Sequence, residues 1–483
     1  MCVHGAGLYV RHDSAASALD QDRCTACPPS RGEVIFSAMK NVEKMISARW
    51  IIPVEPDNQV LDHHTLVIHE GRILDLLPTP EAERRYQADT HRRLDQHALI
   101  PGLINAHTHS PMTLLRGLAD DLPLMDWLQN HIWPAEGRFV GEDFVHDGSL
   151  LAAAEMLRGG TTCFNDMYFF PETTALVASQ VGLRAAIGLI VIDFPSSWAA
   201  NGDEYIAKGL EIYDRHKGNA LLSFCFAPHA PYTVSDEPLK RLVTLADELD
   251  LPIHMHVHET AHEVNEATAR FGVRPLERLA GLGLSGTNLM AIHMTQLQPA
   301  EITHLAQAGT HVVHCPESNL KLASGFCPVQ ALLEAGVNVA LGTDGTASNN
   351  DLDMFGEMRT AALLAKGVSG NAAALPAHTA LRMATLNGAR ALGLADEIGS
   401  LVPGKRADIT AVFMDDLECR PVYDPVSHLI YACGRHQVSD VWVDGRPLLR
   451  DRQLTTIDEA DLHRRIGIWQ EKIARADHQT GSG

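Results

Sequence analysis

Short apolar runs alternate with amphipathic segments through the middle of the chain, from about residue 99 to 399. The intervening segments, such as 239–249 and 299–308, have the spacing of apolar residues that is typical of helices. Eight runs are strand-like and end near His109, Asp166, Asp193, Ala230, His258, Thr295, Glu317 and Asp344. Eight strand-then-helix units in about 300 residues predict an α/β fold, a (β/α)8 or TIM barrel.

Two shorter β segments flank this middle region. Residues 47–54 and 66–74 are strand-like, with a turn at Glu70-Gly71, and a similar pattern returns at 404–412 and 438–446. We therefore expect a composite β-sandwich domain built from both termini. The predicted limits are 39–98 plus 400–455 for this domain, 99–399 for the catalytic barrel, and 456–483 for a C-terminal helix and tail. Residues 1–38 are expected to be a disordered N-terminal extension, whose Cys24 and Cys27 lack the second pair of a zinc knuckle.

Composition narrows the class of protein. The 483 residues are 45% hydrophobic and 20% charged, which is typical of a globular enzyme or binding protein. The formal net charge of −21 argues against nucleic acid as a partner. The sequence has neither a run that is apolar enough to span a membrane nor a signal peptide, so no membrane partner is expected. Nine scattered cysteines predict reduced thiols and a cytoplasmic location.

The candidate chemistry lies at the ends of the apolar runs. The run 99–109 ends in His107-Thr108-His109, and the alternation of a strand would point both imidazoles to the same side. His256, His293 and Asp344 also follow apolar runs. Because active sites in this barrel form at the carboxyl ends of its strands, these residues predict one metal site there.

The fifth run, 251–259, contains three alternating histidines and a glutamate. His254 lies deepest and is expected to be a hydrogen-bonded residue of the barrel, whereas His258 could support the site or lie on the surface. Glu259 is well placed as a general acid or base. The segment from His258 to His262 also matches H-E-x-x-H, the signature of a zinc metalloprotease, but that motif needs a helix where the alternation predicts a strand.

Several longer motifs are specific enough to indicate a family. They are PGLINAHTHSPMTLLRG, IWPAE, APHAPYTVSDE, HMHVHETAHE, HVVHCPESNLKLASG and LGTDGTASNNDLDM. With them the chain resembles the amidohydrolase superfamily from about residue 41 to 450, in its branch of nucleoside and base deaminases. It is most similar to the 5'-methylthioadenosine/S-adenosylhomocysteine deaminase family. The resemblance implies a metal-dependent hydrolase barrel that acts on a carbon–nitrogen bond of a cyclic amidine.

The resemblance also implies a role for each candidate residue. His107, His109, His256 and Asp344 would hold one Zn²⁺ per subunit, with iron or manganese as alternatives. Glu259 would be the proton shuttle, and His293, with Asp344, would orient the attacking water. The residues expected at the substrate are Glu136 at the ribose hydroxyls, His229, Glu259, Ser318 and Asn319 at strand seven, and Trp127, which packs either on the nucleoside or in a helix core.

Two features of the sequence refine this expectation. The fourth run, 221–229, lacks the bridging lysine of two-metal relatives, which favours one metal. The segment 192–198 lacks the arginine expected to bind a homocysteine carboxylate, which favours an uncharged methylthio tail.

The predicted function is therefore the zinc-dependent conversion of 5'-methylthioadenosine to 5'-methylthioinosine and ammonia, with adenosine and S-adenosylhomocysteine as further candidate substrates. An aminohydrolase or chlorohydrolase of guanine- or triazine-type rings is the alternative on the same scaffold. A metalloprotease and an inactive binding protein are remote alternatives. A homo-oligomer, dimer or tetramer, is expected from the resemblance.

Overall fold

The computed structural model of the protein describes residues 39–480, with side chains through residue 475. The predicted extension 1–38, with its Cys24–Cys27 pair, lies outside the described residues.

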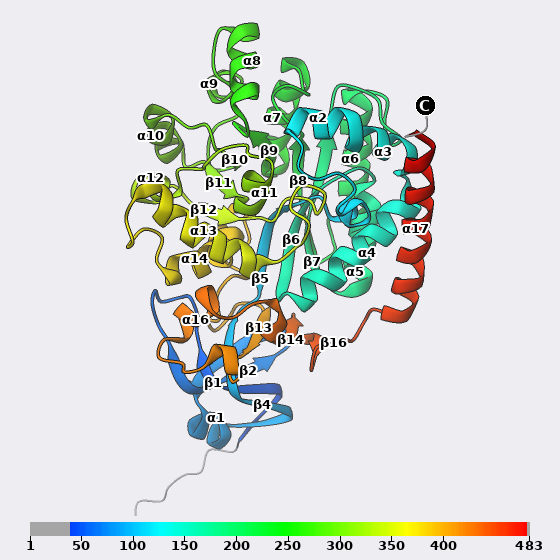
Figure 1. Ribbon diagram of the computed structural model, residues 1–483. Helices are drawn as coiled ribbons and strands as arrows, with labels where there is room; N and C mark the ends of the chain where they lie inside the picture. Colours follow the sequence, from blue (N-terminus) through cyan, green and yellow to red (C-terminus); the bar gives the residue numbers. More distant parts are fainter. Residues whose placement is uncertain (1–38, 481–483) are drawn as a thin grey trace, which may run out of the picture. The chain divides into compact units, whose positions relative to one another are not determined.

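Eight parallel strands form a barrel in which each strand is hydrogen-bonded to the next one along the chain (Figure 1). They are β5 (Leu103–Thr108), β6 (Thr161–Met167), β7 (Arg184–Val191), β8 (Leu222–Pro228), β9 (Ile253–Val257), β10 (Leu289–His293), β11 (His311–His314) and β12 (Val339–Leu341). Every strand ends within three residues of its predicted end. The predicted TIM barrel is thereby confirmed.

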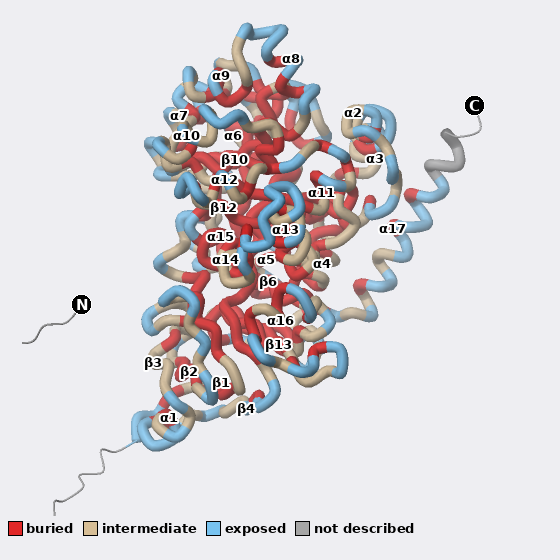
Figure 2. The backbone as a smooth tube through the Cα atoms, turned by 60° about the vertical axis from the view of Figure 1, so that its left-hand side comes forward, coloured by how far each residue is buried: buried red, intermediate tan, exposed pale blue. Residues whose placement is uncertain are grey.

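The barrel strands are buried almost throughout their length (Figure 2). A parallel strand in a barrel meets other side chains inside and helices outside, so its sequence is a continuous apolar run. This is why apolar runs alone located these strands.

The first and last strands meet at their carboxyl ends. The Asp344 N–H donates to the His107 carbonyl at 3.0 Å, and the Asn105 side chain pairs with the Thr343 hydroxyl at 2.7 Å and its N–H at 3.0 Å. Gly342 permits this approach, because a Cβ there would lie 2.8 Å from the His107 backbone nitrogen. Closure of the barrel therefore brings Asp344 beside β5.

Helices follow the barrel strands and cover them. They are α4 (Glu142–Arg158), α5 (Pro171–Val181), α6 (Gly202–His216), α7 (Asp236–Leu249), α8 (Ala261–Phe271), α9 (Pro275–Gly281), α10 (Pro299–Ala308), α11 (Pro316–Lys321), α12 (Val329–Glu334), α13 (Met354–Ser369), α14 (Ala377–Met383) and α15 (Leu386–Ala391). α7 and α10 match the helices predicted at 239–249 and 299–308. Between β5 and α4 the chain forms η1 (Ser110–Leu115), α2 (Leu124–Trp127), η2 (Leu128–Ile132) and α3 (Trp133–Phe139).

A second, mixed sheet is built from both ends of the chain. Its strands are β1 (Lys40–Ile51), β2 (Leu61–His69), β3 (Arg72–Pro78), β4 (Tyr86–Pro101), β13 (Ile409–Phe413), β14 (Val438–Val443), β15 (Arg446–Arg450) and β16 (Gln453–Leu454). The order β16-β15-β14-β13-β4-β1-β2-β3 is continuous, and only β1 and β4 pair in parallel. The predicted sandwich is thus one hydrogen-bonded sheet, in which both halves contribute to a shared apolar cluster.

Two tight turns of this sheet have the geometry that the sequence suggests. Glu70 and Gly71 have φ values of 50° and 73°, and Asp444 and Gly445 have 49° and 69°. Positive φ at both central residues is the type I′ turn that suits a two-residue hairpin. Two helices accompany the sheet: α1 (Thr79–Arg85) joins β3 to β4, and α16 (Pro425–Tyr431) lies between β13 and β14.

The apolar run 99–109 differs from the single strand that was expected. β4 ends at Pro101 in the mixed sheet, and β5 begins at Leu103 in the barrel. Gly102 lies between them, where a Cβ would collide with the Thr162 side chain at 2.0 Å. One continuous apolar run therefore serves two sheets.

Buried charges join the barrel to the mixed sheet. Arg184 at the start of β7 donates to both Asp408 carboxylate oxygens, at 2.9 and 3.2 Å, and to Asp444 at 2.9 Å. The Arg184 and Asp408 side chains are 7% and 2% exposed. Because buried charges are costly unless they are paired, this contact should resist separation of the two parts.

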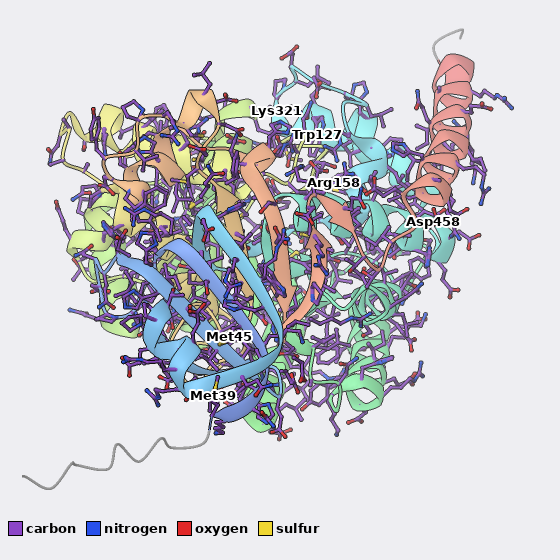
Figure 3. The ribbon with its side chains drawn as sticks, turned by 90° about the horizontal axis from the view of Figure 1, so that it is seen from below. Met39, Met45, Trp127, Arg158, Lys321 and Asp458 are labelled. Carbon is purple, nitrogen blue, oxygen red and sulfur yellow. The ribbon has the colours of Figure 1, made fainter. Side chains whose placement is uncertain are left out.

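The described part of the chain ends with α17 (Glu459–Thr480), which packs against α4. The Trp469 indole N–H donates to Asp147 at 2.9 Å, and Arg158 pairs with Glu459 at 2.6 Å. Arg158 and Asp458, which precedes the helix, are labelled in Figure 3. No helix among residues 39–480 combines the length and apolar character needed to cross a bilayer.

Candidate active site

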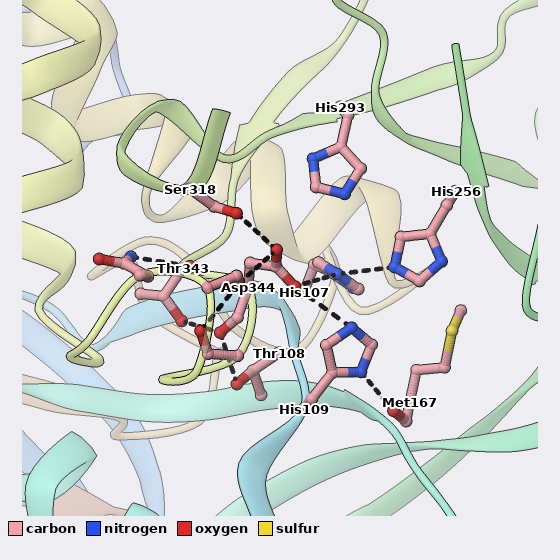
Figure 4. A network of polar contacts seen from close by, with 12 residues as sticks. His107, Thr108, His109, Met167, His256, His293, Ser318, Thr343 and Asp344 are labelled. Atoms are coloured by element: carbon pink, nitrogen blue, oxygen red, sulfur yellow. Dashed lines mark hydrogen bonds and ion pairs between the residues drawn. The ribbon is translucent and has the colours of Figure 1, made fainter. Parts of the chain in front are cut away.

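Four predicted metal ligands meet at the carboxyl ends of the barrel strands (Figure 4). His107 lies on β5, His109 follows that strand, His256 lies on β9 and Asp344 follows β12. One nitrogen or oxygen atom of each residue lies within 4.8 Å of those of the other three. The structure therefore brings together all four residues that the sequence proposes as ligands.

The donor atoms point at one another. Asp344 Oδ1 lies 3.2 Å from His107 Nε2 and 3.2 Å from His109 Nε2. His256 Nε2 lies 3.2 Å from His107 Nε2.

Hydrogen bonds on the opposite ring nitrogens fix two of the imidazoles. His109 Nδ1 donates to the Met167 carbonyl at 2.5 Å, and His256 Nδ1 donates to the His229 carbonyl at 2.7 Å. A carbonyl can only accept, so in each neutral ring Nδ1 carries the proton and Nε2 presents a lone pair. Two lone pairs and a carboxylate oxygen that converge in this way are a donor set that a cation would satisfy. The four residues therefore fit a divalent metal ion.

The second carboxylate oxygen of Asp344 and the second ring nitrogen of His107 also have hydrogen-bond partners. Asp344 Oδ2 accepts hydrogen bonds from Ser318 Oγ at 2.6 Å and Ser348 Oγ at 2.8 Å. His107 Nδ1 lies 2.8 Å from His254 Nε2. The predicted role of His254 as a hydrogen-bonded barrel residue is thereby confirmed.

His258 does not continue the alternation of β9. The strand ends at Val257, and His258 has a φ of 54°, in the left-handed region. Its buried ring accepts the Leu276 N–H at 3.2 Å, so the surface alternative for His258 is wrong. The side chain of His262 is 64% exposed on α8. The two histidines of the H-E-x-x-H motif thus do not share a site, which contradicts the metalloprotease alternative.

Glu259 and His293 lie beside the metal ligands. His293 Nε2 is 3.9 Å from a Glu259 carboxylate oxygen, and His293 Nδ1 donates to Asn319 Oδ1 at 2.9 Å. His293 therefore directs its Nε2 toward Glu259. Burial raises the pKa of Glu259, which favours the protonated form of this carboxyl more than water would.

A cavity of about 360 Å³ opens onto these residues. His109, His256, Glu259, His293 and Asp344 form its polar end. Most of the other walls are apolar or aromatic and come from α2, η2, α3 and the segments after β6, β7 and β8. No lysine or arginine is among the described residues that line it.

Glu136 on α3 also lines the cavity, and Tyr168 donates to its carboxylate at 2.6 Å. Burial raises the pKa of Glu136 to about 7, and the hydrogen bond from Tyr168 opposes part of that rise. A carboxyl that titrates near neutrality in a cavity is typical of a functional group rather than a surface charge.

His229 and Trp127 line the same cavity. His229 Nδ1 lies 3.0 Å from Thr233 Oγ1, and burial lowers the pKa of this histidine to about 3, so its ring is neutral. Trp127 is 5% exposed and packs with Leu115 and Ile132. Trp127 thus fills the helix core that one alternative predicts, and it also lines the cavity; its packing on the nucleoside stays a prediction.

Ser318 and Asn319 differ from expectation. Neither is among the described residues that line the cavity, and they instead hold Asp344 and His293. Sequence reasoning also missed Tyr168 and Ser348. Tyr168 directly follows β6, and Ser348 lies in the loop between β12 and α13; neither segment has a periodic signal, so only the folded chain reveals their contacts.

Comparison with known proteins identifies the class. The amidohydrolase family model matches residues 98–448. The chain is 52% identical over 429 residues to a 5-methylthioadenosine/S-adenosylhomocysteine deaminase of Saccharophagus degradans, covering 89% of this chain and 96% of that protein. It is 49% identical over 432 residues to the protein of the same name from Teredinibacter turnerae, covering 89% and 98%. The chain therefore belongs to the amidohydrolase family, in the group that contains these deaminases.

Solved structures agree with this placement. An adenosine deaminase from Xanthomonas campestris with bound zinc matches with a TM-score of 0.90 and 53% identity, covering 90% of this chain and all of that chain. Guanine deaminase of E. coli matches with a TM-score of 0.76 and 23% identity, covering 85% of this chain and all of that one. The latter likeness shows the fold alone.

Proposed function

We propose that the protein hydrolyses the 6-amino group of 5'-methylthioadenosine, giving 5'-methylthioinosine and ammonia, with one Zn²⁺ per chain. The observation that carries this proposal is the cavity itself. It joins the four candidate metal ligands and the buried Glu259 carboxyl to a second carboxyl, Glu136, within mostly apolar walls. The relatives named as deaminases of this substrate support it.

His107, His109, His256 and Asp344 would hold the metal. When bound, Zn²⁺ supplies a water whose pKa is lowered to about 7, which is a nucleophile at neutral pH. The carboxyl of Glu259 would give its proton to the ring nitrogen next to C6, take up a proton from the attacking oxygen, and pass that proton to the departing amine. His293 Nε2 and Asp344 would orient the attacking oxygen. General acid and base help of this kind contributes roughly 10²–10⁴-fold to the rate.

A nucleoside is favoured over a free base or a triazine because of Glu136. Its carboxylate can accept hydrogen bonds from two ribose hydroxyls, which neither a guanine nor a chlorotriazine ring offers. His229 would contact the purine, with Trp127 packing beside it.

The 5' tail is expected to be uncharged. Phe194 and Pro195 line the cavity with Ser196 and Ser197, and the carboxylates of Glu136, Glu259 and Asp344 face it. The homocysteine carboxylate of S-adenosylhomocysteine would find no cationic partner among the described lining residues, and burying an unpaired charge is costly. A methylthio group suits apolar walls better than the adenosine hydroxyl, by roughly 10- to 200-fold in kcat/KM.

The test is a panel of substrates given to zinc-loaded protein. Ammonia release and the adenine-to-hypoxanthine absorbance change would be followed with 5'-methylthioadenosine, adenosine, S-adenosylhomocysteine, guanine and a chlorotriazine. The proposal predicts the highest kcat/KM for 5'-methylthioadenosine, then adenosine. Activity confined to guanine or the triazine would refute the nucleoside assignment. A lead for S-adenosylhomocysteine would refute the argument about the tail.

Three further predictions accompany this function. Zinc is expected as the native metal, with iron and manganese as alternatives that elemental analysis distinguishes. A homo-oligomer, dimer or tetramer, is expected, which light scattering measures. A cytoplasmic location is expected, which cell fractionation tests.

A further inference from the structure

Glu259 lies in a short link between β9 and α8. His258 takes the left-handed conformation, with φ 54°, and Thr260 begins the helix as its N-cap. A non-glycine residue in this conformation costs free energy and persists only where its surroundings hold it. The direction of the Glu259 side chain therefore depends on what holds this link.

Glu263, on the first turn of α8, holds the link from one side. Its Oε1 accepts the His258 N–H at 2.9 Å, and its Oε2 accepts the Glu259 N–H at 2.7 Å. Thr260 Oγ1 in turn accepts the Glu263 N–H at 3.2 Å. An ordinary capping box returns a glutamate to the N–H of the N-cap residue, whereas this carboxylate reaches the two residues before it.

Thr295, which follows β10, holds the link from the other side. Its hydroxyl lies 2.7 Å from the Glu259 carbonyl, and its N–H donates to the His258 carbonyl at 3.0 Å. The peptide between His258 and Glu259 is thus bonded at both its N–H and its carbonyl, and the peptide after Glu259 is bonded at its carbonyl. Glu263 and Thr295 are not among the described residues that line the cavity.

The placement of Glu263 is costly for the fold. Its side chain is buried, its two oxygens accept hydrogen bonds from backbone N–H groups, and the Glu259 carboxyl lies near enough to repel it. Burial raises the pKa of Glu263 to about 8, which the backbone N–H groups oppose. A second buried acid beside the first is unfavourable for stability, and its two hydrogen bonds to the link that carries Glu259 point to a role in the site.

We propose that Glu263 is a positioning residue, which fixes the peptide of Glu259 so that the Glu259 carboxyl points at His293 and the cavity. This inference rests on the proposed function, in which Glu259 transfers protons. It also assigns the H-E-T-A-H-E segment, residues 258–263, a role other than metal binding, because Glu263 would orient Glu259.

Glu263→Gln is the sharpest perturbation. An amide offers one acceptor oxygen, so one of the two N–H groups loses its partner while the size of the side chain is kept. Small displacements of a reacting group can cost about 100-fold in rate. We expect kcat to fall roughly 10- to 100-fold with KM changed less than about threefold. Glu266→Gln is the matched control, since Glu266 lies on the same helix and its side chain is 52% exposed.

Two further readouts separate positioning from mere stability. Hydrogen exchange followed by mass spectrometry on the zinc-loaded protein should show faster exchange at the amides of residues 258 and 259 in Glu263→Gln but not in Glu266→Gln. In a Glu259→Gln background, adding Glu263→Gln should leave the residual kcat unchanged within about twofold, because both changes act through one group.

The outcomes are distinct. Normal exchange, an unchanged kcat, or multiplicative losses in the double variant would overturn the role of Glu263 while wild-type activity on 5'-methylthioadenosine leaves the proposed function standing. Loss of metal together with equal effects on kcat and KM would show a structural residue and also overturn it. A zinc-loaded wild type that deaminates no purine would overturn both proposals.

Discussion

Removal of one hydroxyl should shift the pH dependence of the reaction. Tyr168→Phe deletes the donor that lies 2.6 Å from the Glu136 carboxylate and leaves the ring in place. Burial already raises the pKa of Glu136 to about 7, and Tyr168 limits that rise. A hydrogen bond to a charged group contributes about 1.5–3 kcal/mol, or about 1–2 pKa units. The Glu136 pKa in the variant should therefore rise to roughly 8–9.

The direction of the effect follows from which form binds ribose. The carboxylate accepts the ribose hydroxyls, so activity is lost as the pH falls through the Glu136 pKa. With a pKa raised by one to two units, the ionised fraction at pH 7 falls roughly 5- to 50-fold, and the deficit disappears at high pH. A positive charge at the neighbouring His109 would lower the Glu136 pKa equally in the wild type and in Tyr168→Phe. The tested quantity is therefore the difference between the pH profiles of these two proteins.

The assay is kcat/KM for 5'-methylthioadenosine from pH 5.5 to 9.5. Tyr213→Phe, on α6 and not among the described residues that line the cavity, controls for loss of a tyrosine hydroxyl. 2',3'-Dideoxyadenosine, which lacks both ribose hydroxyls, should show no difference between Tyr168→Phe and wild type. Superimposable profiles, or a loss that is equal at every pH, would refute the reasoning about Glu136.

Three other variants test different parts of the account. Glu259→Gln should keep the metal by elemental analysis and lower kcat by about 10²–10⁴-fold. Ser318→Ala removes a donor to Asp344 and should weaken metal affinity about 10- to 100-fold in a competition with a chelator. Arg184→Ala leaves Asp408 buried without its partner and should lower the free energy of unfolding by about 3–5 kcal/mol in urea.

Each of these has a contradicting result. Near-normal turnover of Glu259→Gln would remove it from the chemistry. Unchanged metal affinity in Ser318→Ala would show that Asp344 needs no support from that hydroxyl. Arg475→Ala, which breaks an exposed ion pair with Glu471, is the comparison for Arg184→Ala. If Arg184→Ala lowers the free energy of unfolding by less than about 1 kcal/mol, as Arg475→Ala should, the contact between barrel and sheet behaves like a surface ion pair.

The sequence predicted the barrel well because its strands are buried on both sides, so that each leaves an apolar run. The ligands could be placed because each follows such a run. β4 was recognised only at its apolar end, since residues 86–97 are mostly polar and partly exposed. The division at Gly102 was also hidden, because apolar residues continue through it.

Contacts made after the strands end were the least predictable. Tyr168 and Thr295 act through single hydroxyl groups whose partners are distant in the sequence. His258 takes a left-handed backbone conformation and so breaks the alternation of β9, and no residue of the sequence there predicts that conformation. Ser318 and Asn319 were correctly placed near the site, but their partners are Asp344 and His293 rather than the cavity.

We propose that one metal ion, held by four residues at the ends of the barrel strands, enables deamination of 5'-methylthioadenosine. The most direct measurement is a titration of metal-free protein with Zn²⁺, following the absorbance change of this substrate. We expect negligible activity without metal and a linear rise that stops at one equivalent per chain. Full activity in the metal-free protein, or a rise that continues to two equivalents, would contradict it.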